Sequence, residues 1–157
     1  VAHLYNNRAL HLLAKAENPA DPAVLQTAKE ELRISLRIKP DFTRALSNLG
    51  VLLTRMGEYH RAEYAYRKAI LYDPRFASAT HNLGLLFGRQ GKQEMAIEWL
   101  QKAVQLDSQS SHFKAHLATA LLKKGKRKQA IAVLEHAVKK HPKNERLQYQ
   151  LQQVRQQ

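Results

Sequence analysis

The chain has 157 residues, of which 44% are hydrophobic and 25% charged, as in an ordinary globular domain. Its 26 Lys and Arg outnumber its 13 Asp and Glu, and the resulting formal net charge of +13 favours an acidic or phosphate-bearing partner. The absence of cysteine excludes disulfides, thiolate zinc sites and a cysteine nucleophile. No apolar run reaches the roughly 18 residues that a membrane-spanning helix needs. We therefore expect one soluble domain, with the cytoplasm and the periplasm both open as its compartment.

The same residue types return at a fixed interval of about 34 residues, which is the spacing of a helix–turn–helix repeat. Because one such hairpin cannot bury its own apolar face, several must stack to form a core. Three series carry the period: Ala28, Ala62, Ala96 and Ala130; Gly57, Gly91 and Gly125; Leu49, Leu83 and Leu117.

The stretch 43–76 shows the repeating unit most clearly. Three leucines at i, i+3 and i+7 predict one face of a first helix: Leu46, Leu49 and Leu53. Gly57 follows that face, where a helix commonly ends in a left-handed residue. Pro74 cannot continue the second helix and is expected to end it. Small residues at three slots allow the paired helices to approach closely: Gly50, Ala62 and Ala69.

These residues, together with Tyr66, resemble the consensus of the tetratricopeptide repeat (TPR) family, and the resemblance covers nearly the whole chain. It implies an all-α fold, an α-α superhelix or solenoid of about four helix–turn–helix repeats. It also implies a protein–protein interaction module or scaffold that has no cofactor and is not an enzyme. In such arrays the first helix of each repeat lines the concave surface.

The first repeat is expected over residues 2–42, with a first helix over 2–17 in which Arg8 occupies a slot where the family has Leu. Ala28 follows Ala9 at a longer interval than Ala62 follows Gly50, so the turn carries about seven extra residues near Glu17–Pro22. Asp21 is a candidate N-cap of the second helix, with Pro22 at its first position.

Three further repeats are expected over residues 43–76, 77–110 and 111–144, followed by a capping helix over 144–156. Asn144 is the candidate N-cap of that last helix, whose apolar stripe is Leu147, Leu151 and Val154. We expect residues 1–157 to form a single TPR domain. Because the chain begins at Val1, we also expect it to be part of a longer protein.

The resemblance indicates which side chains line a peptide-binding groove. An Asn recurs on the inward face and offers both a donor and an acceptor to a peptide backbone. The expected groove residues are Asn7, Arg44, Asn48, Val51, Arg55, His81, Asn82, Leu85, Arg89, His112, His116 and Lys123. Leu10, Val51 and Leu85 would form an apolar floor. We expect a basic concave groove that holds an acidic peptide or helix, in preference to the alternative that these Asn residues are simply solvated consensus positions.

Two other patterns suggest different chemistry. His112 and His116 have the helical spacing of metal ligands, but such pairs are mostly incidental and we expect no metal site. The basic run 123–128 leaves an alternative, an electrostatic binder of nucleic acid or acidic surfaces through the basic C-terminal half. No aromatic residue interleaves that run, so nucleic acid is the less favoured partner. The partner and the oligomeric state are not readable from these patterns.

Overall fold

A computed structural model describes residues 1–15 and 21–156, and within these it contains nine α-helices and no strand. The helices are α1 Ala2–Lys15, α2 Pro22–Ile38, α3 Thr43–Arg55, α4 Tyr59–Tyr72, α5 Ala77–Arg89, α6 Gln93–Leu106, α7 Ser111–Lys123, α8 Arg127–Lys140 and α9 Glu145–Gln156. None of these helices is long and apolar enough to cross a membrane.

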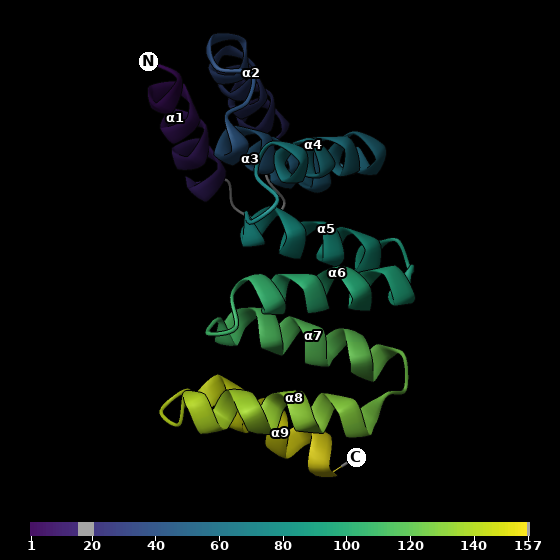
Figure 1. Ribbon diagram of the computed structural model, residues 1–157. Helices are drawn as coiled ribbons and strands as arrows, with labels where there is room; N and C mark the ends of the chain where they lie inside the picture. Colours follow the sequence, from purple (N-terminus) through teal and green to yellow (C-terminus); the bar gives the residue numbers. More distant parts are fainter. Residues whose placement is uncertain (16–20, 157) are drawn as a thin grey trace. The chain divides into compact units, whose positions relative to one another are not determined.

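The chain divides into two compact units, with the division inside α5. Unit 1 is Val1–Asn82, where α1 packs on α2 and α3, and α3 packs on α2 and α4. Unit 2 is Leu83–Gln157, where α7 packs on α6, α8 and α9, and α8 packs on α9. Figure 1 shows α6, α7 and α8 lying side by side within unit 2.

Turns inside the hairpins are built as the glycine series predicts. Gly57, Gly91 and Gly125 have φ between 75° and 76°, a left-handed conformation that a Cβ would strain. At the first of them, Gly57 N–H donates to Thr54 O at 3.2 Å and Glu58 N–H donates to Leu53 O at 2.9 Å. This pair of bonds satisfies carbonyls that the end of α3 would otherwise leave free.

Paired helices approach one another through small residues, also as predicted. A methyl group at Gly50 on α3 would lie 2.7 Å from Tyr66 Cζ on α4, closer than real contacts allow. At the corresponding position of α5, a methyl group on Gly84 would lie 2.8 Å from Leu100 Cγ. Ala96, which packs beneath α5 from α6, is fully buried.

Local expectations for the first repeat are met where the structure describes it. Asp21 Oδ1 accepts a hydrogen bond from Ala23 N–H at 2.8 Å, and Pro22 opens α2. The rest of the expected insertion, residues 17–20, lies outside the described residues. Arg8 does not enter the core in place of Leu, since its guanidinium is exposed and lies 2.9 Å from Glu31 Oε1.

The last helix, α9, completes the core of unit 2. Leu147, Leu151 and Val154 are all less than 9% exposed and join the cluster that contains Leu121 and Leu134. Leu147 N–H donates to Asn144 Oδ1 at 3.2 Å, so Asn144 caps α9 as expected.

Replacing Ala96 with Leu should push α6 away from α5 and destabilise the protein. Overpacking of a close helix contact typically costs about 1–3 kcal/mol, so the melting temperature should fall. Circular dichroism during heating measures this. Gln101→Leu, on the exposed side of the same helix, is the control and should melt close to the original protein. An equal effect of the two variants would contradict the helix register.

Replacing Leu151 with Asp should detach α9, because a carboxylate would then face the apolar cluster without a partner. We expect a cost of about 3 kcal/mol or more, seen in urea unfolding followed by circular dichroism. Gln152→Asp places the same charge on the exposed side of α9 and should cost much less. If both variants unfold at the same urea concentration, α9 contributes little to the core.

Candidate functional site

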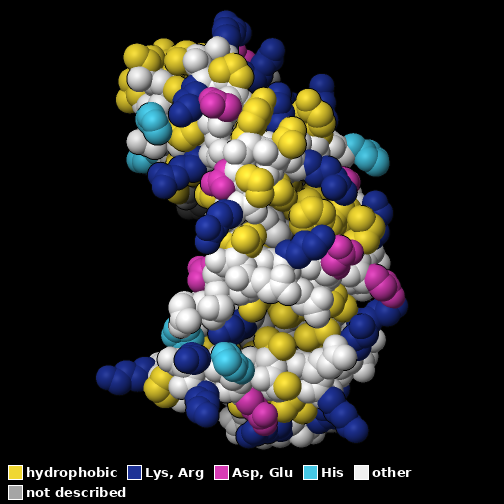
Figure 2. Space-filling model, in the orientation of Figure 1, with side chains coloured by type: hydrophobic (Ala, Val, Ile, Leu, Met, Phe, Trp, Pro, Cys, Tyr) yellow, Lys and Arg dark blue, Asp and Glu magenta, His cyan; other side chains and the backbone are white. Residues whose placement is uncertain are grey.

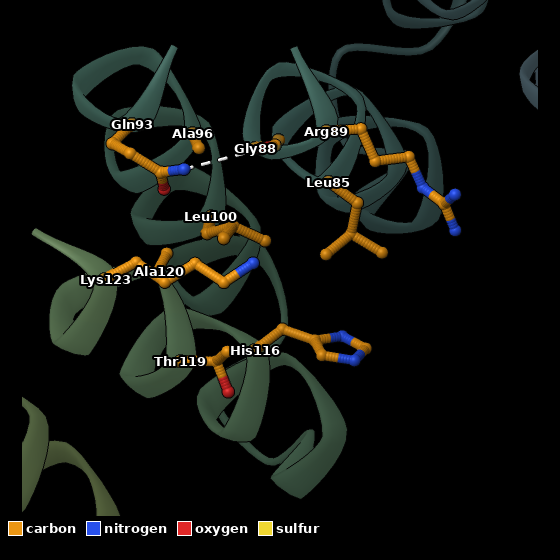
Figure 3. A pocket seen from close by; sticks show the side chains of 11 residues that line it. Leu85, Gly88, Arg89, Gln93, Ala96, Leu100, His116, Thr119, Ala120 and Lys123 are labelled. Atoms are coloured by element: carbon orange, nitrogen blue, oxygen red, sulfur yellow. Dashed lines mark hydrogen bonds between the residues drawn. The ribbon is translucent and has the colours of Figure 1, made fainter. Parts of the chain in front are cut away.

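Helices α5, α6 and α7 enclose a hollow of about 340 Å³ within unit 2, which we call the α5–α7 groove (Figure 3). Its floor is apolar, with Ala96, Leu100 and Ala120 buried and Leu85 half-buried. Gly84 and Gly88 lie on the α5 side. The absence of side chains there widens the groove, since even a methyl group at Gly88 would touch Ala96 at 3.7 Å.

The rim of the α5–α7 groove is cationic. Arg89 at the end of α5 and Lys123 at the end of α7 are both exposed, and no Asp or Glu is among the lining residues. Figure 3 shows the Lys123 side chain reaching across the groove towards Leu100, while Arg89 projects outward from α5. A negatively charged group entering here would therefore meet two cations without a competing carboxylate.

Gln93 supplies an acceptor that the sequence patterns did not single out. Its Nε2 donates to Gly88 O at 3.4 Å, and its Oε1 is buried with no hydrogen-bond partner among the described residues. A buried carbonyl without a donor is costly, so this atom is an unsatisfied polar group beside the groove. The repeat pattern does not predict a role for Gln93, because the equivalent positions of the neighbouring repeats hold Tyr59 and Arg127.

His116 lies on the opposite wall and is neutral at pH 7. Burial lowers its pKa from 6.5 to about 4, with further lowering by the neighbouring His112 and Arg146. The rings of His112 and His116 meet edge to face with their centroids 4.3 Å apart. A neutral imidazole can both donate and accept a hydrogen bond, which suits it to a polar contact with a peptide.

A second hollow of about 260 Å³ adjoins the α5–α7 groove, because His116 and Thr119 line both. Its other wall is α9, through Arg146, Tyr149 and Gln150. Gln150 Nε2 donates to Thr119 Oγ1 at 3.1 Å and to Ala115 O at 3.2 Å, while the Tyr149 side chain is 65% exposed. The last helix therefore also presents surface to a ligand, beyond the capping role that its apolar stripe predicts.

In unit 1, two of the expected groove residues are engaged within the fold. Asn48 Nδ2 donates to Asn6 Oδ1 at 2.8 Å, and Arg55 Nη1 donates to Leu13 O at 2.8 Å. Both bonds tie α3 to α1, and the second satisfies a carbonyl in the last turn of α1. The buried Asn6 is the partner that the sequence did not reveal.

The remaining expected groove residues of unit 1 differ in exposure. Asn7 and Arg44 are exposed, and Val51 and Asn82 are half-buried. Leu10, expected in the floor, is 42% exposed. His81 is only 4% exposed, so its ring presents almost no surface to a ligand.

The basic run 123–128 forms the turn between α7 and α8. Gly125 takes the left-handed conformation there, and Lys124 pairs with Glu94 on α6. That hydrogen bond lowers the pKa of the Glu94 carboxyl below its ordinary value. One cation of the run is thus already paired within the fold.

A family model described as "Anaphase-promoting complex, cyclosome, subunit 3" matches residues 49–137, more than half of the chain. No curated protein sequence matches the chain significantly.

Solved structures share its fold at low identity. TTC0263, a thermophilic TPR protein of Thermus thermophilus, is 18% identical with a TM-score of 0.77, and 100% of each chain is covered. Pseudomonas aeruginosa pilF is 24% identical with a TM-score of 0.84, covering 98% of this chain and 67% of that one. YrrB, described as a TPR protein with an unusual peptide-binding site, is 18% identical with a TM-score of 0.71, covering 98% and 76%. The fold is thus an all-α helical repeat solenoid.

The depressed pKa of His116 predicts a pH dependence of stability. Between pH 6.5 and about 4 the unfolded chain binds a proton at this residue that the folded chain does not, so stability should fall as the pH falls through this window. Melting temperatures measured from pH 7 to pH 4.5 should show a smaller decrease for His116→Gln than for the original protein. His60→Gln, exposed on α4, controls for loss of an imidazole. Parallel curves for all three proteins would refute the assignment.

Proposed function

Because the chain belongs to the tetratricopeptide repeat family, through the model of anaphase-promoting complex subunit 3, we propose that it is a scaffold whose α5–α7 groove binds an acidic peptide or helix. Arrays of this family are generally non-enzymatic modules for protein–protein interaction. The proposal includes a single domain over residues 1–157 with repeats at 2–42, 43–76, 77–110 and 111–144.

The observation that carries the proposal is an apolar floor under a cationic rim. Leu85, Leu100 and Ala120 offer a surface to one apolar side chain of a partner, and Arg89 and Lys123 stand beside it. On the face shown in Figure 2, Lys and Arg side chains are dispersed among hydrophobic ones instead of being gathered in one patch. Charge alone therefore does not mark a site, whereas the combination of hollow, floor and cations does.

The two parts of the groove should contribute differently. Burial of an apolar side chain supplies lasting affinity, at about 25 cal/mol for each Å² removed from water. The cations speed encounter with an acidic partner and fix its register. The adjoining Tyr149 extends the contact surface onto α9.

Arg89 and Lys123 line the groove and are expected to bind the partner, whereas Arg55 is not. Arg55 already donates to Leu13 O, so engaging a ligand would uncap the end of α1. Asn48 is similarly held by Asn6. Arg146, which lines the adjoining hollow, takes the place of Arg55 as a third cation.

A direct test uses a short fluorescein-labelled peptide of alternating Leu and Glu, with the same peptide carrying Lys for Glu as its counterpart. The Glu peptide should bind in fluorescence anisotropy and the Lys peptide should not. Arg89→Glu combined with Lys123→Glu should weaken binding by about tenfold or more, and should reduce the salt dependence of what remains.

The matched control is Lys126→Glu with Lys128→Glu, which reverses two exposed charges in the basic turn. Binding of the Glu peptide should be reduced far less by this pair. An equal reduction by both pairs would show that overall charge, and not the groove, governs binding. Random-sequence DNA at two salt concentrations tests the alternative function, since tight binding that weakens steeply with salt would favour nucleic acid as the partner.

A further inference from the structure

Lys114 on α7 places an amine in the interior of unit 2. Its side chain is only 4% exposed, and its Nζ makes no hydrogen bond among the described residues. The equivalent slots of the two preceding repeats hold Leu46 and Thr80, which are buried without carrying a charge. Burying an ammonium group without an acceptor is costly, so the residue is poorly explained as a packing element.

Beside Lys114 lies a cavity of about 350 Å³, formed by α6, α7 and α8 within unit 2. Its walls are largely apolar, with Val104 from α6, Leu117 from α7 and Val133 from α8. Ser108 and His136 add polar groups. No residue of this cavity lines the α5–α7 groove, so the two are separate sites on different faces of α7.

The charges around the amine leave it unneutralised. Burial lowers the pKa of Lys114 below its ordinary value, the positive charge of Lys140 lowers it further, and Asp107 partly opposes both. Asp107 forms no hydrogen bond with Nζ. An incoming anion would supply the acceptor that the fold omits.

We propose that this cavity binds an apolar carboxylate, with its tail against Val104, Leu117 and Val133 and its carboxylate paired with Lys114 Nζ. The flexible four-carbon stem of lysine lets the amine turn towards a ligand without movement of the backbone. This site is independent of the peptide groove and of the function proposed for it.

Size and chemistry restrict the ligand. At roughly 30 Å³ for each water-sized group, the cavity accommodates roughly ten non-hydrogen atoms. One amine among apolar walls suits a monocarboxylate, whereas a phosphate calls for several donors or a bidentate arginine. Either a free short-chain acid or the C-terminal carboxylate of a peptide that ends in an apolar residue has this chemistry.

The test is a titration of the isotopically labelled protein followed by NMR, with hexanoate as the free acid and N-acetyl-leucine as the mimic of a peptide C-terminus. Hexanol and N-acetyl-leucine amide are the matched uncharged probes. At least one acid should shift the amide signals of Leu117 and Val133, and the uncharged probes should bind more weakly. The acid that binds more tightly identifies the source.

Lys114→Met should weaken binding of the acid by about tenfold to a hundredfold, as expected for loss of a charge-assisted hydrogen bond. Lys139→Met, exposed on α8, should leave it unchanged. Because Met removes the unpaired amine, the variant should fold and melt no lower than the original protein. Val133→Phe is a second variant that fills the cavity while keeping the amine, and it should also abolish binding.

Three results would overturn the proposal. The first is the absence of any shift with either acid at millimolar concentration. The second is equal binding of the acids and their uncharged counterparts, which would show that the amine takes no part. The third is unchanged affinity in Lys114→Met or in Val133→Phe, which would place the ligand elsewhere.

Discussion

The rest of the structure depends on how closely the two helices of a hairpin approach. Where a hairpin presents Gly50 to the ring of Tyr66, or Gly84 to Leu100, no side chain larger than a hydrogen fits between them. In the three later hairpins a left-handed glycine in the turn, Gly57, Gly91 or Gly125, then returns the chain so that the second helix lies along the first. These two constraints act on backbone geometry. The side chains on the outer faces are therefore not needed for this packing and can serve in binding.

The α5–α7 groove follows from the same constraint. Gly84 and Gly88 bring α5 close to α6 and leave no side chains over Ala96 and Leu100, which become the floor of a hollow. Arg89 and Lys123 lie in the last turns of α5 and α7, where a positive charge interacts favourably with the helix dipole. A single pair of residues therefore serves both helix stability and the proposed recognition of an acidic partner.

Polar residues in a repeat array have two competing uses, and the structure separates them. Arg55 and Asn48 hydrogen-bond α3 to α1, whereas Arg89 and Lys123, at helix ends equivalent to that of Arg55, line the α5–α7 groove. Lys114 belongs to neither group, since it is buried like a packing residue but its amine has no hydrogen-bond partner in the part of the chain that the structure describes. That distinction depends on which neighbour lies within hydrogen-bonding distance, and repeat position alone does not reveal it.

The sequence by itself determined the helices, their turns and their small packing slots, because a period of about 34 residues places the same local chemistry at each hairpin. It also located Leu85, Arg89, His116 and Lys123 on one surface, through their place in the first helices of two repeats. Only the tertiary structure decided that Asn6 holds Asn48, that Gln93 and α9 border the site, and that Lys114 stands unpaired beside a cavity. The reason is physical: backbone conformation is set by neighbours in the chain, whereas hydrogen bonding and burial of a side chain are set by residues brought together from other helices.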